Sequence, residues 1–213
     1  MKNYFFDLDG TLTDSADGIV NSVIYSLKTF GIEETDRVAL RAFVGPPLKD
    51  SFMERYGFSP EEAEEALLRF RERFTSIGIF ENSLYRGIPE VLSVIRGRGD
   101  RVILATSKPE VFAKRILDHF DLTPYFDYIC GANLDESNRV EKDAVLQYAL
   151  EVSGAVPEDS YMIGDRKYDV EAGRKLGFST VGVLYGYGSR EELEKAGADV
   201  ICETVEELRE VLE

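Results

Sequence analysis

The sequence predicts an α/β protein in which a doubly wound, Rossmann-like parallel sheet forms the core and an α-helical domain is inserted after the first strand. Short apolar runs alternate along most of the chain with segments whose apolar residues recur at helical spacing. Such continuous apolar runs are typical of parallel strands buried on both faces, and their alternation with helices indicates a doubly wound sheet. Between residues 16 and 83 the strand-like runs stop and only the helical spacing remains.

Apolar runs that are mostly rich in β-branched or aromatic residues are the expected strands. They are residues 4–8, 101–105, 161–163, 180–184 and 199–202. Apolar stripes that include Leu92, Ile116 and Val145 predict helices between these strands. Gly197 follows a helical pattern directly, at a position where glycine commonly ends a helix.

The inserted segment carries helix signals of its own. Apolar residues recur at helical spacing from Ile19 to Phe30, and the run Ser-Pro-Glu-Glu at residues 59–62 forms a capping box with proline at the first helical position. We therefore expect two domains. They are a core made of residues 1–15 and 84–213 and a helical domain made of residues 16–83.

Composition limits the partners of this chain. It has 213 residues, 44% of them hydrophobic, and a net charge of −15 from 40 acidic and 25 basic residues. Such a surface repels polymeric nucleic acid and anionic membranes, so we expect neither as a partner. An acidic protein that handles an anionic substrate must gather local positive charge from a metal ion, a lysine or backbone N–H groups.

Cysteine usage and hydropathy favour a cytoplasmic protein. Cys130 and Cys202 each end a short apolar run, which is typical of buried, reduced strand residues. No apolar stretch approaches the length of a membrane span, and the apolar run at the start is too short for a signal peptide. The sequence leaves open whether the chain is a monomer or a homodimer.

Polar residues at strand ends indicate where the chemistry lies. In an open parallel sheet, ligands bind beyond the carboxyl ends of the strands, so side chains that follow different strands meet at one edge. The residues that should meet there are Asp7, Asp9, Thr106, Ser107, Asp165 and Asp169, joined by Lys142 at the start of a helix. Aspartates, hydroxyl groups and a lysine from distant parts of the sequence thus converge.

This set of side chains predicts a magnesium site. Crowded carboxylates repel one another and their pKa values rise unless a cation intervenes. Oxygen ligands suit Mg²⁺, which also binds substrate phosphate, so Mg²⁺ is the expected cofactor. Lys142 would add positive charge for a phosphoryl group in transfer, and the Thr106 hydroxyl can donate a hydrogen bond to a phosphate oxygen.

The run Asp-Leu-Asp-Gly-Thr at residues 7–11 resembles the nucleophile motif of the haloacid dehalogenase superfamily. Thr106 resembles the second motif of that superfamily and Lys142 the third. Residues 164–169 resemble the fourth motif, in the form with two aspartates four residues apart. The motifs follow one another in the family's order, and the resemblance covers nearly the whole chain.

The inserted helices resemble the cap of the phosphoglycolate-phosphatase-like branch of this superfamily. Residues 43–48, 105–109 and 184–188 resemble bacterial 5′-nucleotidase-like members of that branch, whereas Tyr168 stands where many relatives carry histidine. The resemblance implies a mobile cap that closes over the site and excludes water. Its hinges would lie near residues 14–17 and 84–87.

The resemblance also implies roles for the aspartates. Asp7 would attack phosphorus and become an aspartyl phosphate. Asp9 would protonate the leaving alcohol, activate the water that hydrolyses the intermediate, and offer its main-chain carbonyl to Mg²⁺. Asp7 and Asp165 would supply carboxylate ligands to the metal, and Asp169 would bind it through water or orient Lys142.

Four further residues are expected to serve phosphate or substrate. They are Gly10, Thr11, Ser107 and Lys49. Gly10 would permit a tight turn and close approach of phosphate. Thr11 would support the loop by hydrogen bonding, and Ser107 would donate its main-chain N–H. Lys49 is either a grip on the rest of the substrate or a solvated lysine, and these two interpretations are about even.

Other conspicuous side chains have ordinary interpretations. Lys108 begins a helical segment and is expected to be solvated, and His119 lies near a helix end, where capping or dipole duty is common. Tyr185 and Tyr187, which lie between glycines, either line a nucleobase pocket or, as we expect, pack on the core.

The predicted function is Mg²⁺-dependent hydrolysis of small phosphate monoesters, with nucleoside 5′-monophosphates or phosphoglycolate as candidate substrates. A phosphomutase of the same fold is the main alternative, because the motifs do not separate water from sugar as phosphoryl acceptor. A dehalogenase is disfavoured, since dehalogenating relatives lack the second aspartate that Asp9 provides. A non-catalytic binding module is the remaining alternative.

Overall fold

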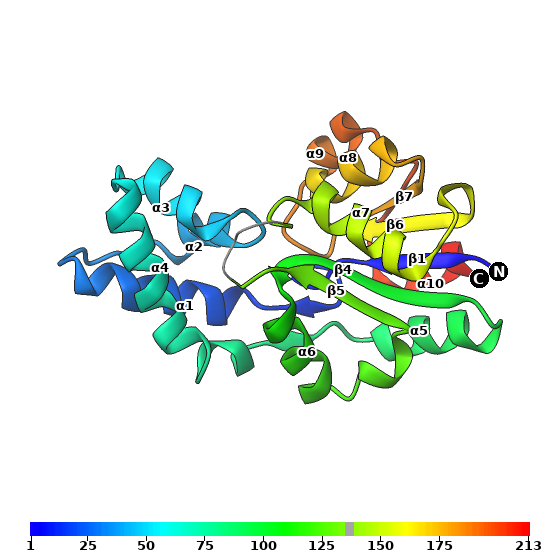
Figure 1. Ribbon diagram of the computed structural model, residues 1–213, viewed down its shortest axis with the longest axis horizontal. Coiled ribbons are helices and arrows are strands. Elements are labelled where there is room, and N and C mark those ends of the chain that lie inside the picture. The colour runs from blue at the N-terminus through cyan, green and yellow to red at the C-terminus, as the bar shows by residue number, and fades with distance from the viewer. Residues whose placement is uncertain (135–138) are drawn as a thin grey trace. The chain divides into compact units, whose positions relative to one another are not determined.

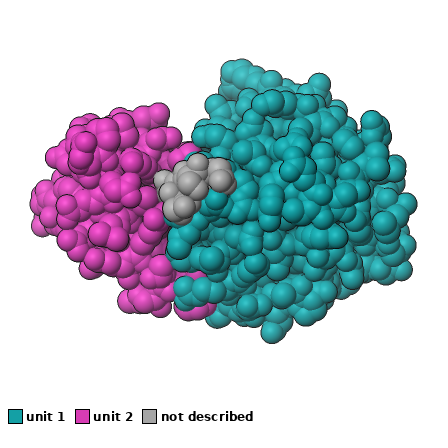
Figure 2. Space-filling model, viewed as in Figure 1, with its two compact units in different colours: residues 1–14, 84–213 teal, residues 15–83 magenta. Residues whose placement is uncertain are grey.

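The computed structural model in Figure 1 describes residues 1–134 and 139–213. The chain forms two compact units, coloured separately in Figure 2. The first comprises Met1–Asp14 and Leu84–Glu213, and the second comprises Ser15–Ser83. The predicted α/β class is confirmed, because the first unit is built on a six-stranded parallel sheet and the insert between its first strands is helical.

The sheet of the first unit has the strand order β5-β4-β1-β6-β7-β8, with every neighbouring pair parallel. Its strands are β1 (Asn3–Phe6), β4 (Arg101–Pro109), β5 (Tyr128–Ala132), β6 (Ser160–Gly164), β7 (Ser179–Val183) and β8 (Val200–Cys202). Strand β1 lies between β4 and β6, at the point where the order of connection reverses. Ligands bind at such a switch point, so Asp7, which follows β1, is placed there by topology.

Helices cover both faces of the sheet, as Figure 1 shows, with α5 and α6 on one side and α7 and α8 on the other. The helices of this unit are α5 (Ile88–Gly97), α6 (Glu110–His119), α7 (Lys142–Ser153), α8 (Lys167–Lys175), α9 (Arg190–Ala196) and α10 (Val205–Leu212). Phe5 of β1 packs with Ile103, Val145 and Met162 in a fully buried cluster. Apolar runs of β1, β4 and β6 and the apolar stripe of α7 thus contribute to one core cluster.

Three details of the strands differ from the sequence prediction. The sequence indicated strand β5 only through the short apolar run that ends at Cys130. The expected set of strands omits it, because that run is short and Tyr128 at its start is 36% exposed at the edge of the sheet. Strand β1 ends at Phe6, two residues early, because the Leu8 carbonyl accepts hydrogen bonds from the N–H groups of Leu12 and Thr13 and turns the chain. A small sheet of β2 (Thr13–Asp14) and β3 (Ser83–Leu84) was also not predicted.

The second unit consists mainly of helices. They are α1 (Ala16–Thr29), α2 (Arg37–Leu40), α3 (Leu48–Tyr56) and α4 (Pro60–Phe74). The predicted capping box is confirmed, since the Ser59 side chain accepts from Glu62 N–H and the Glu62 carboxylate accepts from Ser59 N–H. Phe43 and Phe52, with ring centroids 5.1 Å apart, are buried in the core of this unit. No helix among the described residues is long and apolar enough to cross a bilayer.

Gly18 of α1 lies against the turn at Gly78. A Cβ atom on Gly18 would stand 2.0 Å from the Gly78 carbonyl oxygen, and Gly18 N–H donates to the Glu81 carbonyl at 3.0 Å. No side chain, however small, fits between these two backbones. The packing of α1 in this unit therefore requires glycine at position 18.

We predict that Gly18→Ala destabilises the protein although alanine is the better helix former. Overpacking costs on the order of 1–3 kcal/mol, which exceeds the helix propensity gained. Gly97→Ala in α5 is the matched control, because nothing lies within 4 Å of its added Cβ. That control should be neutral or stabilising by roughly 0.5–1 kcal/mol in urea unfolding. Equal effects of the two substitutions would contradict the packing argument.

Candidate active site

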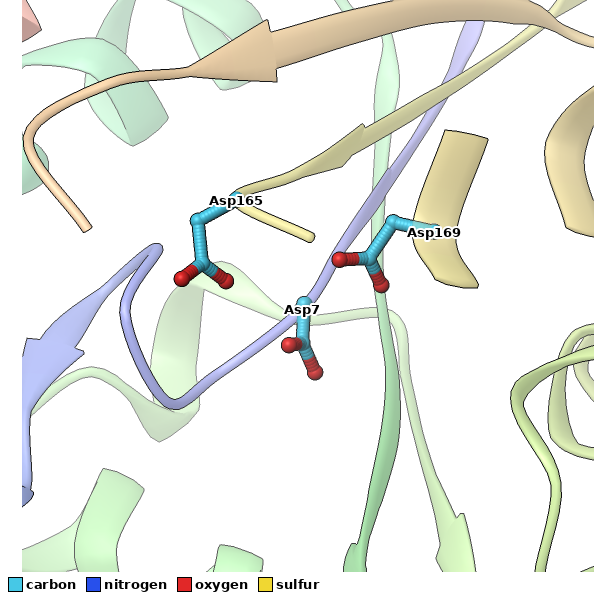
Figure 3. Close-up of side chains that lie close together, drawn as sticks. All are labelled: Asp7, Asp165 and Asp169. Carbon is cyan, nitrogen blue, oxygen red and sulfur yellow. The ribbon is translucent and has the colours of Figure 1, made fainter. Parts of the chain in front are cut away.

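Three aspartates converge at the carboxyl edge of the sheet, as Figure 3 shows. Asp7 follows β1 and its N–H donates to the Ile163 carbonyl of β6 at 2.9 Å, so β1 stays in register with its neighbour to its last residue. Asp165 follows β6, and Asp169 lies in the first turn of α8. Carboxylate oxygens of the three residues lie within 4.8 Å of one another, and all three side chains are buried.

Asp169 folds back over the end of β6 for local reasons. Its Oδ2 atom accepts a hydrogen bond from Arg166 N–H at 3.1 Å and thereby caps α8. A Cβ atom on Gly164 would stand 2.2 Å from the Asp169 carboxyl carbon, so glycine at that position makes room for the carboxylate. In the pair Gly164-Asp165, the glycine therefore leaves space for the Asp169 carboxylate, and the next residue supplies the Asp165 carboxylate.

Lys142 is the counter-ion of this cluster. Its ammonium lies 2.7 Å from Asp7 Oδ1 and 2.8 Å from Asp169 Oδ1, and it donates a hydrogen bond to the Ala105 carbonyl at 3.1 Å. Burial alone would lower the pKa of Lys142, but attraction to Asp169 and Asp7 outweighs burial and raises it. The lysine therefore keeps its charge in the core of the site.

Two of the three aspartates, Asp165 and Asp169, have raised pKa values. Burial, with repulsion from Asp169 and Asp7, raises the pKa of Asp165 well above its ordinary value. Burial also raises the pKa of Asp169 to about 6, although its ion pair with Lys142 acts in the opposite direction. One lysine does not compensate three buried carboxylates, so the cluster retains an unmet demand for positive charge.

The donor set fits a hard divalent cation. All ligands on offer are carboxylate oxygens, which Mg²⁺ prefers. Asp165 Oδ1 is buried and has no hydrogen-bond partner among the described residues, while Asp165 Oδ2 accepts from Tyr187 N–H at 2.8 Å. A buried, unpaired carboxylate oxygen is costly, and a cation between Asp7 and Asp165 would satisfy it.

A loop after β7 fastens both Asp165 and the segment that follows β1. The Tyr185 hydroxyl donates to the Thr11 carbonyl at 3.1 Å, and the Tyr187 hydroxyl donates to Asp14 Oδ1 at 2.8 Å. A Cβ atom on Gly186 would stand 2.3 Å from the Gly10 carbonyl oxygen. The two hydroxyl groups thus tie this loop to the segment after β1, and the Tyr185 ring packs against Tyr85 with centroids 4.9 Å apart.

Gly10 and Thr11 take places that the sequence only partly anticipated. Gly10 has φ +84°, and a Cβ atom there would stand 2.2 Å from Asp165 Oδ2. The glycine is therefore required by a neighbouring carboxylate as well as by the turn. The Thr11 hydroxyl is buried without a partner in the described part of the chain, so this residue supports the loop through its main-chain carbonyl.

Sequence reasoning missed Lys108, which is not solvated. The register of β4 against β5 shifts between Thr106 and Pro109, and Lys108 N–H donates to Thr106 Oγ1 at 3.2 Å. The Lys108 ammonium lies 2.6 Å from Asp9 Oδ2, with side chains only 6% and 12% exposed. The available signal was the strand period of two, which puts Lys108 on the face of Thr106 if the strand continues.

The structure places the remaining candidates away from this cluster or leaves their roles open. Ser107 is half-buried beside Thr106 in β4. Lys49 lies in the second unit, 2.9 Å from Glu64 Oε2, and its role toward substrate stays a prediction. His119 is the exposed last residue of α6. The guanidinium carbon Cζ of Arg166 lies 5.6 Å from the centroid of the Tyr168 ring.

The fold and the site together define an aspartate-based enzyme that acts at the edge of a doubly wound sheet. The family model for haloacid dehalogenase-like hydrolases matches residues 4–183, and the chain belongs to that family. A 5′-nucleotidase of Pseudomonas aeruginosa is 43% identical over 99% of this chain and 95% of its own length. With these matches, the site makes the chain a phosphatase of the family.

Two further relatives show the range of the family near this chain. A crystal structure of a predicted phosphatase from Clostridium acetobutylicum is 48% identical, with a TM-score of 0.95 over 99% of this chain and 97% of the other. The tyrosine-protein kinase PtkA of Mycobacterium tuberculosis is 40% identical over 97% of this chain and 71% of its own length. Proteins of similar sequence to this chain thus carry the names of different activities, a 5′-nucleotidase and a tyrosine-protein kinase.

We predict that Mg²⁺ stabilises the protein increasingly as the pH rises. In the metal-free protein the raised pKa of Asp169, about 6 against an ordinary 3.8, contributes stability that is present at low pH and lost as the pH rises through 6. A bound cation replaces the departing protons, so its benefit should grow over the same interval.

The measurement is the melting temperature with excess Mg²⁺ and with chelator at pH 5 and pH 7.5. The shift caused by Mg²⁺ should be larger at the higher pH and should shrink in Asp165→Asn, which removes the unpaired oxygen. A shift that is equal at the two pH values would contradict the protonation of this cluster in the metal-free protein.

Proposed function

We propose that this protein is a Mg²⁺-dependent phosphomonoesterase that hydrolyses small phosphate esters through a phosphorylated Asp7, with nucleoside 5′-monophosphates as the preferred class. The observation that carries the proposal is the buried group formed by Asp7, Lys142, Asp165 and Asp169 at the switch point of the sheet. The similarity to the 5′-nucleotidase of Pseudomonas aeruginosa supports the choice of substrate class.

Asp7 is the nucleophile in this proposal. Lys142 holds Asp7 Oδ1, which leaves the other carboxylate oxygen to attack phosphorus in line with the leaving oxygen. A bond forms between the Asp7 carboxylate and phosphorus while the ester P–O bond breaks. Lys142 and the Thr106 hydroxyl supply positive charge and a hydrogen bond for the oxygens of the phosphoryl group in transfer.

Asp9 moves the proton. It lies two residues from the nucleophile, and its Oδ1 atom is buried without a hydrogen-bond partner among the described residues. In the first step its carboxyl group gives a proton to the leaving alkoxide, which departs as an alcohol. In the second step the resulting carboxylate takes a proton from water, whose oxygen attacks the phosphoryl group and frees Asp7.

The residues that would hold Mg²⁺ are Asp7 and Asp165, with Asp169 and the Asp9 main-chain carbonyl nearby. Bound there, the ion would neutralise charge on the phosphate and let an anionic ester approach a group of aspartates. The small phosphorylated substrate is the only partner that the proposal requires.

We predict that Asp7→Asn lowers kcat by at least about 10³-fold, because the amide is not a nucleophile toward phosphorus. The fold should survive, since asparagine has nearly the same shape and Lys142 keeps Asp169 as a partner. Asp118→Asn on the exposed surface of α6 is the control and should retain full activity. Comparable turnover by Asp7→Asn would exclude the covalent mechanism.

The proposed substrate class is tested by phosphate release from a panel of esters with Mg²⁺ and with excess chelator. The panel contains nucleoside 5′-monophosphates, phosphoglycolate, hexose phosphates and an aryl phosphate. We expect the highest kcat/KM for nucleoside 5′-monophosphates and no release in chelator. Preference for phosphoglycolate would replace the substrate class, and undiminished release in chelator would refute the metal requirement.

Phosphoryl transfer to an acceptor other than water is the second candidate. It includes the phosphomutase alternative, and the similarity to the tyrosine-protein kinase PtkA favours keeping it. The same chemistry forms the phosphorylated aspartate, so the acceptor alone separates the two functions. Transfer would be established if no free phosphate appears while a new phosphorylated product forms, either a rearranged hexose phosphate or a phosphorylated protein tyrosine. Absence of both would support a non-catalytic binding module.

A further inference from the structure

Lys108 occupies a position that the proposed reaction does not yet explain. Lys108 follows Thr106 by one strand period, within the stretch where the register of β4 shifts against β5, and its side chain is only 6% exposed. Irregularities of this kind next to active sites commonly re-aim a side chain. Burying the long side chain of a lysine costs both desolvation and conformational entropy, so its place beside Asp9 calls for a compensating contact.

The contact with Lys108 makes the two carboxylate oxygens of Asp9 unequal. Lys108 lies 2.6 Å from Oδ2, whereas Oδ1 is buried and has no hydrogen-bond partner among the described residues. An ion pair at this distance fixes the rotation of the carboxylate about its last bond. Oδ1 is thereby the oxygen left for a further partner, and its direction is set by Lys108.

We propose that Lys108 is a positioning residue for proton transfer: it holds Asp9 Oδ2 so that Oδ1 faces the leaving oxygen of the ester. This inference rests on the proposed function, in which Asp9 protonates the leaving group. Lys142 holds Asp7 in the same way through Oδ1. Two buried lysines then orient the two reacting carboxylates, one the nucleophile and the other the proton donor.

Two other roles for Lys108 predict different behaviour. A lysine that only balances the charge of the site would affect stability and leave the chemistry of the leaving group unchanged. A lysine that grips the phosphate would raise KM equally for every ester, because all esters carry the same phosphate. A positioning role alone makes the loss depend on how much the leaving group needs a proton.

The experiment compares an alkyl ester, a nucleoside 5′-monophosphate, with p-nitrophenyl phosphate, whose leaving group departs without a proton. The quantity is kcat/KM, which reports the steps up to departure of the leaving group and excludes later attack by water. For Lys108→Met we expect a loss on the order of 10²-fold with the alkyl ester and less than about tenfold with the aryl ester.

Matched variants separate this effect from misfolding. Lys195→Met is the control, because Lys195 forms an ion pair of the same 2.6 Å length with Glu191 on the exposed surface. Lys108→Gln, which can still donate a hydrogen bond to Asp9, should recover part of the loss with the alkyl ester. Lys108→Met in an Asp9→Asn background should add little, since the residue it positions is already disabled. Melting temperatures identify any variant that fails to fold.

Two outcomes overturn the proposal. Equal losses with both esters would assign Lys108 to phosphate binding, and unchanged kcat/KM with both would assign it to charge balance alone. If the wild-type protein hydrolyses neither ester, the proposed function fails. If the wild type hydrolyses both and the variant loses them equally, only the role of Lys108 fails.

Discussion

The burial of carboxylates beside too few cations is the constraint on which the rest of this structure depends. Among the residues that the structure describes, Asp7, Asp9 and Asp169 form ion pairs with two lysines, Lys108 and Lys142. Together with Asp165 these six groups, if all are ionised, carry two net negative charges. Charge removed from water must be paired, protonated or bound to a metal. The raised pKa values of Asp165 and Asp169 follow from this imbalance. A divalent cation would cancel the remaining charge, so the folded site favours the binding of such an ion.

Backbone packing keeps the aspartates together despite their repulsion. Gly10, Gly164 and Gly186 lie where a Cβ atom would collide with Asp165, with Asp169 and with the Gly10 carbonyl respectively. The loop after β7 adds hydrogen bonds to Asp165 and to the Thr11 carbonyl in the segment after β1. The energy stored in the carboxylate cluster is thus opposed by the stability of the sheet and its loops, which is how strained sites persist in folded proteins.

The strands and helices that depend on local pattern could be predicted, and those that depend on context could not. The central strands are buried on both faces and read as unbroken apolar runs, whereas β5 lies at the edge and begins with the exposed Tyr128. The capping box at Ser59 was predictable because both partners lie within one helical turn. The ion pair of Lys108 with Asp9 joins residues 99 positions apart, so only the folded sheet brings the two side chains together.

The sequence by itself determined the chemistry, because strand ends in a parallel sheet gather at one edge and the residue types there, aspartates with a lysine, allow few reactions. It also determined the doubly wound class and the helical insert, through the periods of its apolar residues. Only the tertiary structure decided how each carboxylate is held: Lys142 between Asp7 and Asp169, Tyr187 on Asp165, and Lys108 on Asp9. These are contacts between distant segments, and their geometry exists only once the sheet has brought the segments together.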